Sequence, residues 1–182
     1  MSHPELEEHL REAVAARRAG RTEDGWRHLI AAEAICRSMG WRRDLVTTLA
    51  GMAQLHRDAA DFASALPLYE EAVVHAQQLR NPIVLARALR HLGEVYLELR
   101  QFERAQQHLR DAIDLYRIGP DAPPLELANA VRPLAICLER QGATGESRRC
   151  WNEARDLYAA LGIEPGVTEC EAALARLQEL PD

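Results

Sequence analysis

The chain has 182 residues with a formal net charge of −6, and 47% of the residues are hydrophobic. This composition is typical of a globular protein, and the acidic balance argues against nucleic-acid binding, which needs a basic stripe. All 22 basic residues are arginine, which excludes a Walker A phosphate loop and Schiff-base chemistry, because both need a lysine.

The N-terminus and the apolar runs of the sequence predict neither a secretory signal nor a membrane span. No stretch of 18 apolar residues is present, so no membrane-spanning helix is predicted. The first eight residues, Met-Ser-His-Pro-Glu-Leu-Glu-Glu, are acidic and lack the apolar segment of a secretory signal. We therefore expect a cytoplasmic protein.

Apolar residues recur with a helical period along almost the whole chain. The expected helices, in chain order, are 4–19, 22–38, 43–58, 62–79, 82–100, 102–118, 124–141, 144–161 and 166–179. Short polar connections join them as four antiparallel pairs, each with a first helix A and a second helix B, followed by one single helix.

Local signals mark several helix ends. Asn81 precedes Pro82, which predicts an N-cap followed by a proline at the first helical position. Gly40, Gly119 and Gly162 stand where B helices should end.

Three proline features disturb this regular pattern. Gly119-Pro-Asp-Ala-Pro-Pro124 predicts a rigid loop between two helix pairs. Pro67 and Pro133 fall inside helical patterns, where we expect either a kink or a late helix start at each.

Small residues recur in three columns, and bulky residues recur in a fourth column with the same steps of 40, 40 and 42 residues. The columns are Ala13, Ala53, Gly93, Ala135; Gly25, Ala65, Ala105, Ser147; Ala32, Ala72, Ala112, Ala154; and Leu29, Tyr69, Leu109, Trp151. A fixed period of this length indicates a repeat array in which each unit packs against its neighbours. The small residues are expected where helices A and B cross closely.

The third repeat resembles the tetratricopeptide repeat (TPR). It contains Leu92-Gly93-x-x-Tyr96, then Ala105-x-x-x-Leu109 and Ala112, with Leu89 in place of the usual tryptophan. The resemblance covers about residues 5–160, and the step of 40–42 residues is similar to the longer kinesin-light-chain-like variety.

The resemblance implies an all-α fold: an α-solenoid of four antiparallel helix pairs with a C-terminal capping helix, wound as a right-handed superhelix. It implies one TPR domain over 1–182, with repeats at about 4–40, 41–80, 81–121 and 122–162 and a capping helix at 165–180. The A helices of such a fold line a concave groove that receives a peptide or a helix.

Matching positions along the A helices places a set of polar side chains on the groove side. The set is Thr47, Gln54, Arg57 and Asp58 in the second repeat, Arg87, Arg90, His91, Glu94 and Glu98 in the third, and Asn129, Arg132, Glu139 and Arg140 in the fourth. We expect the ligand-binding groove to use Arg57, Arg87, Arg90, His91, Glu94, Asn129 and Arg132.

Arginines on neighbouring A helices suggest a specific chemistry. Arg87, Arg90 and Arg132 could converge on one carboxylate or phosphate, which arginine binds in a bidentate manner. The alternative is ordinary solvated charge balanced by Glu94 and Glu98. The lysines of the carboxylate clamp in chaperone-binding TPR proteins are absent, so binding of a chaperone's acidic tail is not expected, while an arginine-based clamp remains an alternative.

Other chemistry-bearing residues favour packing over catalysis. His28 and His108 take equivalent B-helix positions, which predicts packing, and His56 is expected to face the core. Each of the four cysteines stands alone inside an apolar pattern, which predicts reduced thiols. Hydrolase, zinc and phosphate-loop motifs are missing, so we expect no enzymatic activity, no metal and no cofactor.

Trp41 has two interpretations: it plugs a crevice between repeats, or it is an exposed anchor for a partner. For the whole chain we expect an adaptor that binds a peptide or helical segment of a partner protein in the groove. The alternatives are a self-assembly scaffold, with a possible homodimer, and a regulatory partner of a signalling or transcription protein.

Overall fold

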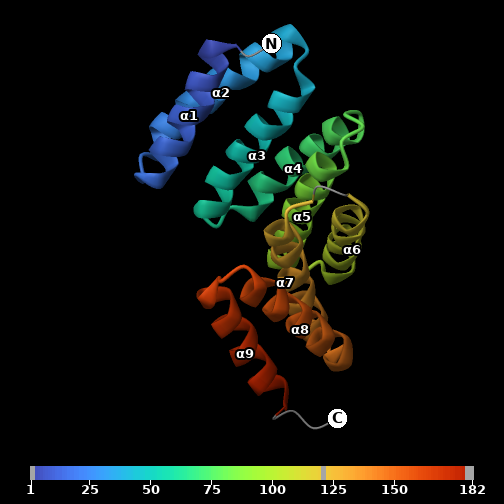
Figure 1. The fold of residues 1–182 in the computed structure, drawn as a ribbon. Helices are drawn as coiled ribbons and strands as arrows, with labels where there is room; N and C mark the ends of the chain where they lie inside the picture. Colours follow the sequence, from blue (N-terminus) through green and yellow to red (C-terminus); the bar gives the residue numbers. More distant parts are fainter. Residues whose placement is uncertain (1–2, 120–121, 179–182) are drawn as a thin grey trace. The chain divides into compact units, whose positions relative to one another are not determined.

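The computed structural model describes residues 3–119 and 122–178. Within these residues the secondary structure is nine α-helices, without a strand (Figure 1). They are α1 (Pro4–Arg18), α2 (Thr22–Met39), α3 (Arg42–Asp58), α4 (Phe62–Gln77), α5 (Pro82–Glu98), α6 (Phe102–Ile118), α7 (Pro124–Arg140), α8 (Thr144–Ala160) and α9 (Glu164–Gln178). Every described helix boundary lies within two residues of its predicted position. The predicted all-α class, with four helix pairs and a last single helix, is confirmed.

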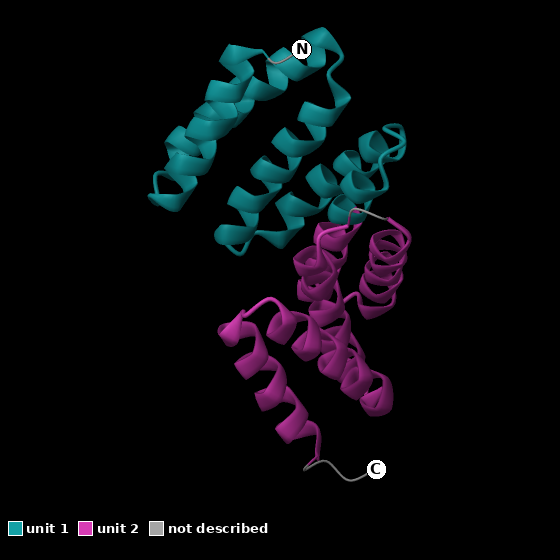
Figure 2. Cartoon of the chain, in the orientation of Figure 1, with its two compact units in different colours: residues 1–88 teal, residues 89–182 magenta. Residues whose placement is uncertain are grey.

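The contacts divide the chain into residues 1–88 and 89–182, here called unit 1 and unit 2 (Figure 2). In unit 1, α1 packs on α2, α2 on α3 and α3 on α4, and α1 also contacts α3. In unit 2, α6 packs on α7, α7 on α8 and α8 on α9. Helix α5 begins in unit 1 and ends in unit 2. One domain over 1–182 stays a prediction.

Two expected features reach beyond the described residues. The predicted loop 119–124 includes residues 120 and 121, and the predicted capping helix 165–180 includes residues 179 and 180. These four positions lie outside the part of the chain that the structure describes.

The residues that predict helix ends lie at the ends of helices in the structure. The side-chain oxygen of Asn81 accepts hydrogen bonds from the backbone N–H groups of Ile83 and Val84, each at 3.1 Å, and so caps α5. Helix α2 ends before Gly40, whose φ of 67° is in the left-handed region that favours glycine. The ends of α2, α6 and α8 therefore follow the glycine signals.

Both unusual prolines lie inside continuous helices. Helix α4 begins five residues before Pro67, and α7 begins nine residues before Pro133. A late helix start is therefore wrong for both, because packing of the helix outweighs the one backbone hydrogen bond that each proline removes. A kink at each proline stays a prediction.

All twelve residues of the small columns are buried, as predicted. The reason is a close crossing of helices A and B inside each repeat. A Cβ atom added to Gly93 on α5 would lie 2.7 Å from Cγ of Leu109 and 3.2 Å from the carbonyl oxygen of Ala105, both on α6. In the fourth repeat the hydroxyl of Ser147 donates to the carbonyl oxygen of Ala135 at 2.9 Å, which explains a serine in this column.

One backbone feature repeats with the same step but was not predicted. The residue that ends each turn from helix A to helix B is left-handed: Gly20, Ala60, Arg100 and Gly142 have φ values of 70°, 55°, 59° and 76°. A non-glycine residue is strained there, because its Cβ approaches the backbone. Ala60 and Arg100 therefore hold a conformation that glycine adopts more easily.

The tryptophans pack as structural residues in the described chain. Trp151 is 2% exposed, as its place in the bulky column predicts. Trp26 packs against the unit 1 core and meets the ring of His56 edge-on, with 4.8 Å between ring centroids. Trp41 is half-buried, and its ring lies 5.1 Å from that of His3. This contact favours the packing interpretation of Trp41 over an exposed anchor.

Candidate binding surface

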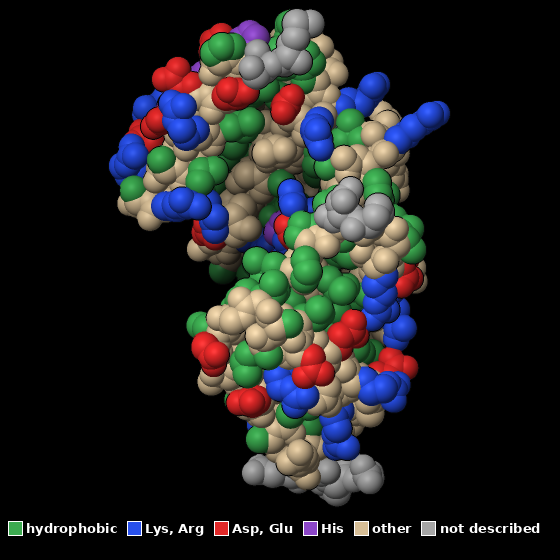
Figure 3. Space-filling view, in the orientation of Figure 1, with side chains coloured by type: hydrophobic (Ala, Val, Ile, Leu, Met, Phe, Trp, Pro, Cys, Tyr) green, Lys and Arg blue, Asp and Glu red, His purple; other side chains and the backbone are tan. Residues whose placement is uncertain are grey.

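Surface charge is mixed in both units. Acidic and basic side chains are interspersed over the visible faces of unit 1 and unit 2 (Figure 3). Many arginines pair with a carboxylate of the next helix of the same type, as Arg110 does with Glu146 at 2.7 Å. A candidate binding surface is therefore one where arginines lack a carboxylate partner inside the fold and apolar side chains are exposed to solvent.

Unit 1 has a pocket between its two A helices, α1 and α3. Its volume is about 140 Å³. Its walls are mainly apolar, and the polar residues are Arg17, Thr47 and Gln54. The apolar residues that line it are Leu10, Ala13, Val14, Leu29, Gly51 and Leu55. Val14 is 49% exposed, so this apolar surface is open to solvent.

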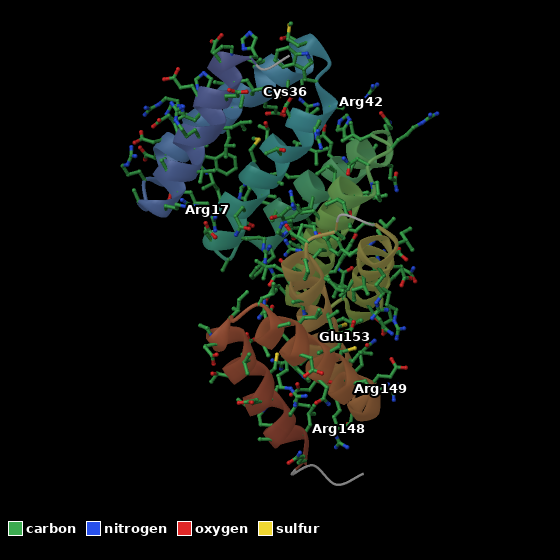
Figure 4. The ribbon with its side chains drawn as sticks, in the orientation of Figure 1. Arg17, Cys36, Arg42, Arg148, Arg149 and Glu153 are labelled. Atoms are coloured by element: carbon green, nitrogen blue, oxygen red, sulfur yellow. The ribbon has the colours of Figure 1, made fainter. Side chains whose placement is uncertain are left out.

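An ion pair closes one end of the α1–α3 contact. Arg17 lies at the end of α1 (Figure 4), and its guanidinium donates to the carboxylate of Asp58 on α3, with Nη2 to Oδ1 at 3.1 Å. Gln54 donates to the same oxygen at 2.9 Å. The hydrogen bond from Arg17 lowers the pKa of Asp58 below its ordinary value, against the opposing effect of partial burial. The expected groove residue Arg57, next to Asp58, is half-buried.

In unit 2 three expected groove residues belong to one buried network. Arg90 is 9% exposed. Its guanidinium donates to Glu94 at 2.6 Å and to Glu126 of α7 at 3.4 Å, and it meets Nε2 of His91 at 3.2 Å. His91 Nδ1 also lies 3.4 Å from the second oxygen of Glu94, and the hydroxyl of Tyr116 on α6 donates to Glu126 at 3.4 Å.

The network holds Arg90 as a cation inside the protein. Burial acts to lower the pKa of Arg90, but the charges of Glu94 and Glu126 act in the opposite direction, and the net pKa is raised. The guanidinium of Arg90 is thus already paired with two carboxylates inside the protein. The network connects α5, α6 and α7, and so links the third and fourth repeats.

The two expected residues on α7 also have partners inside unit 2. Arg132 donates to Glu169 of α9 at 2.9 Å, and Asn129 accepts a hydrogen bond from the hydroxyl of Tyr158 on α8 at 2.8 Å. Arg87 is exposed and lies in unit 1, whereas Arg90 and Arg132 lie in unit 2. Their convergence on one anion stays a prediction.

A second pocket lies between the A helices α5 and α7 of unit 2. It has a volume of about 340 Å³ and is lined by Leu97, Glu98, Arg100, Phe102, Ile136 and Arg140. Leu97, Phe102 and Ile136 are half-buried, while Arg100 and Arg140 are exposed. The sequence analysis placed Glu98 and Arg140 on the groove side but missed the other four residues.

A third pocket, of about 350 Å³, lies on the B-helix side of unit 2 between α6, α7 and α8. Its polar walls are arginines and carboxylates that bind one another: besides the Arg110–Glu146 pair, Arg117 pairs with Glu153 at 2.7 Å. Figure 4 shows Arg149 and Glu153 on α8, at this pocket. Because these charges are paired across the pocket, it offers less to a ligand than the α5–α7 pocket.

Two histidines outside the pockets pack against neighbouring rings. His28 meets His9 with 3.0 Å between their Nδ1 atoms, and His108 stacks on Tyr96 with ring centroids 5.4 Å apart. Among the described residues, no three His, Cys, Asp or Glu side chains come together as a metal site. The packing interpretation of His28 and His108 fits these contacts.

The four thiols are free, and three of them are buried. Burial raises the pKa of Cys137 to about 11 and that of Cys170 to about 11. Burial also raises the pKa of Cys36 and of the half-buried Cys150. Thiolate is therefore scarce at neutral pH, which is unfavourable for a nucleophile or a metal ligand.

Comparison with known proteins agrees with this geometry. Residues 44–118 match the family model of the tetratricopeptide repeat. A search of curated proteins found no match. The family match thus covers the second and third repeats, and the helix pairs of the described residues have the arrangement that the tetratricopeptide repeat implies.

Three solved structures show the same fold at low sequence identity. The apo form of RapI has a TM-score of 0.84 and 14% identity over 91% of this chain and 60% of RapI. NprR in complex with its cognate peptide NprX has a TM-score of 0.73 and 15% identity over 97% of this chain and 52% of NprR. The putative kinesin light chain TPR-like repeats of Podospora anserina have a TM-score of 0.72 and 14% identity, covering 98% of this chain and 97% of that one.

The chain thus spans about three fifths of RapI and about half of NprR. None of the described helices is long and apolar enough to cross a membrane.

Proposed function

We propose that the protein is a non-enzymatic interaction module that binds a peptide or helical segment of a partner protein along its A helices. The observation that carries this proposal is the pair of pockets between successive A helices, one between α1 and α3 and one between α5 and α7. Each combines apolar walls with a few polar side chains, which is the chemistry that peptide side chains need.

A rigid helical array suits this role. The close A–B crossings hold each pocket in place before a partner arrives, so little ordering of the protein is needed on binding. The solved structure of NprR with its cognate peptide gives an example of a similar fold that binds a peptide.

Photocrosslinking tests the proposal directly. Benzoylphenylalanine is introduced at Thr47, which lines the α1–α3 pocket, and separately at Val74, which is 53% exposed on helix α4. We expect the first variant to form crosslinks to a partner segment in lysate of the source organism, identified by mass spectrometry, and the Val74 variant to lack them. Equal crosslinks from both positions, or crosslinks from Val74 alone, would contradict binding along the A helices.

Light scattering distinguishes the self-assembly alternative. A mass that rises with concentration, together with crosslinks between two copies of this chain at Thr47, would show that the bound partner is a second copy of this chain. A mass of one chain at all concentrations would exclude that alternative.

A further inference from the structure

We propose that the pocket between α5 and α7 in unit 2 binds an acidic–apolar segment of the partner: an aliphatic or aromatic side chain next to a carboxylate. The inference rests on the proposed function and names the chemistry that one part of the A-helix surface recognises. It is carried by the pocket's apolar walls, its two arginines and a comparison with the equivalent place in unit 1.

Unit 1 carries different side chains at the equivalent place. The repeat steps of 40, 40 and 42 residues make Arg17 equivalent to Leu97 and Asp58 equivalent to Arg140. In unit 1 these positions carry the ion pair between α1 and α3. In unit 2 the first position is apolar and the second is a cation, so the same ion pair cannot form. The pocket of about 340 Å³ in unit 2 includes both of these positions, whereas the pocket in unit 1, of about 140 Å³, includes Arg17 but not Asp58.

A neighbouring position on the A helices also differs between unit 1 and unit 2. Gln54, which donates to Asp58 in unit 1, is equivalent to Ile136 in unit 2. Leu97 and Ile136 therefore replace two polar residues, and Phe102, at the start of α6, completes the apolar wall. All three side chains are half-buried, so part of their apolar surface still meets water. Covering that surface would favour binding by the hydrophobic effect.

The two arginines of this pocket differ from the expected groove arginines of unit 2. Arg90 and Arg132 have carboxylate partners inside the fold. The side chains of Arg100 and Arg140 have no ion pair with a carboxylate among the residues that the structure describes. Glu98 also lines the pocket, so two arginines and one glutamate leave a formal charge of +1 beside the apolar wall.

Charge and shape together select the ligand. A guanidinium binds a carboxylate with two parallel hydrogen bonds, and such charge-assisted bonds are stronger than neutral ones. The volume lies near the lower end of ligand pockets, about 300–1,000 Å³, which suits one or two side chains. A chain with net charge −6 and only +1 at this pocket does not suit a polyanion such as nucleic acid.

The test uses the full chain and an array of blocked, fluorescein-labelled octapeptides. Each peptide contains one Leu, Ile, Met or Phe flanked by two Asp or Glu residues, and a matched peptide has Asn or Gln at the acidic positions. Fluorescence polarisation measures the affinities. We expect the best acidic peptides to bind about tenfold or more tightly than their amide counterparts, the difference that charged hydrogen bonds of this kind produce.

Three variants, each lowering the net charge by one, identify the site. Arg100→Gly removes a side chain at a position where φ is 59° and glycine is less strained, so folding should be retained. Leu97→Arg/Arg140→Asp installs the residues of the unit 1 ion pair. Arg149→Gln removes an exposed charge from α8. We expect the first two variants to lose the preference for acidic peptides and Arg149→Gln to keep it, with circular dichroism showing that all three are folded.

The inference is overturned if no acidic peptide binds the wild type more tightly than its amide counterpart. It is also overturned if the preference survives in both Arg100→Gly and Leu97→Arg/Arg140→Asp, or if Arg149→Gln loses it equally. These outcomes leave the crosslinks at Thr47 unaffected, because Thr47 lies in the other pocket. Failure of the acidic–apolar specificity is thus distinguishable from failure of the proposed function.

Discussion

Replacing Arg90 by methionine tests whether the buried network of unit 2 stabilises the repeat packing. Methionine keeps much of the apolar stem of arginine but removes the charge. It would leave the carboxylates of Glu94 and Glu126 without their common cation, at side-chain exposures of 13% and 19%. Breaking a buried pair by removing one partner typically costs about 3–5 kcal/mol. For a chain of this size we expect about 3 kcal/mol, or a melting temperature lower by roughly 6–12 °C.

The control for this experiment lies one turn earlier on the same helix. Arg87 is exposed, so Arg87→Met should change the free energy of unfolding by about 0.5 kcal/mol or less. Chemical unfolding followed by circular dichroism compares the two variants. An Arg90→Met protein as stable as Arg87→Met would refute the role of the network.

Three further predictions follow from packing, backbone and charge. Ala105→Leu should destabilise the protein by about 1–3 kcal/mol or more because Ala105 is fully buried at the A–B crossing, and an unchanged melting temperature would contradict this. Ala60→Gly should stabilise it by roughly 0.5–1 kcal/mol, since glycine relieves the left-handed strain; urea unfolding that shows a loss would refute that strain. Arg17→Met should raise the pKa of Asp58 in an NMR titration of its carboxyl group. Because the native pKa is lowered, the pair stabilises the fold above the ordinary carboxyl pKa, and this contribution, below about 1 kcal/mol for so exposed a pair, is lost as pH falls through the native value.

The repeat spacing predicted most of the fold because side-chain size alone determines where two helices can cross. The columns containing Gly93 and Ala105 placed the crossings correctly, and the glycine and asparagine signals placed the helix ends. The left-handed turns at Ala60 and Arg100 were missed, because alanine and arginine carry no sequence signal for that backbone conformation. Their step from Gly20 would have revealed them, since backbone geometry repeats even where the residue does not.

The candidate binding surface was harder to predict than the fold. Helix position predicts Glu98 and Arg140 on the groove side, and both line the α5–α7 pocket, but it cannot show which arginines are already bound to carboxylates. Arg90 is bound by Glu94 and Glu126, and Glu126 is 36 residues away in sequence. The α5–α7 pocket becomes visible in the sequence only when Leu97 and Arg140 are aligned with Arg17 and Asp58.

The three buried thiols can report on local opening of the helices that carry them. Cys36 reports on α2 in unit 1, while Cys137 and Cys170 report on α7 and α9 in unit 2. A thiol without access to solvent can be alkylated only after its helix opens. The labelling rate of each of these cysteines at increasing urea therefore measures the free energy of opening its own helix, with no engineered label. Equal values at all three would describe one cooperative folding unit, and a gradient along the chain would describe an array that unfolds from an end.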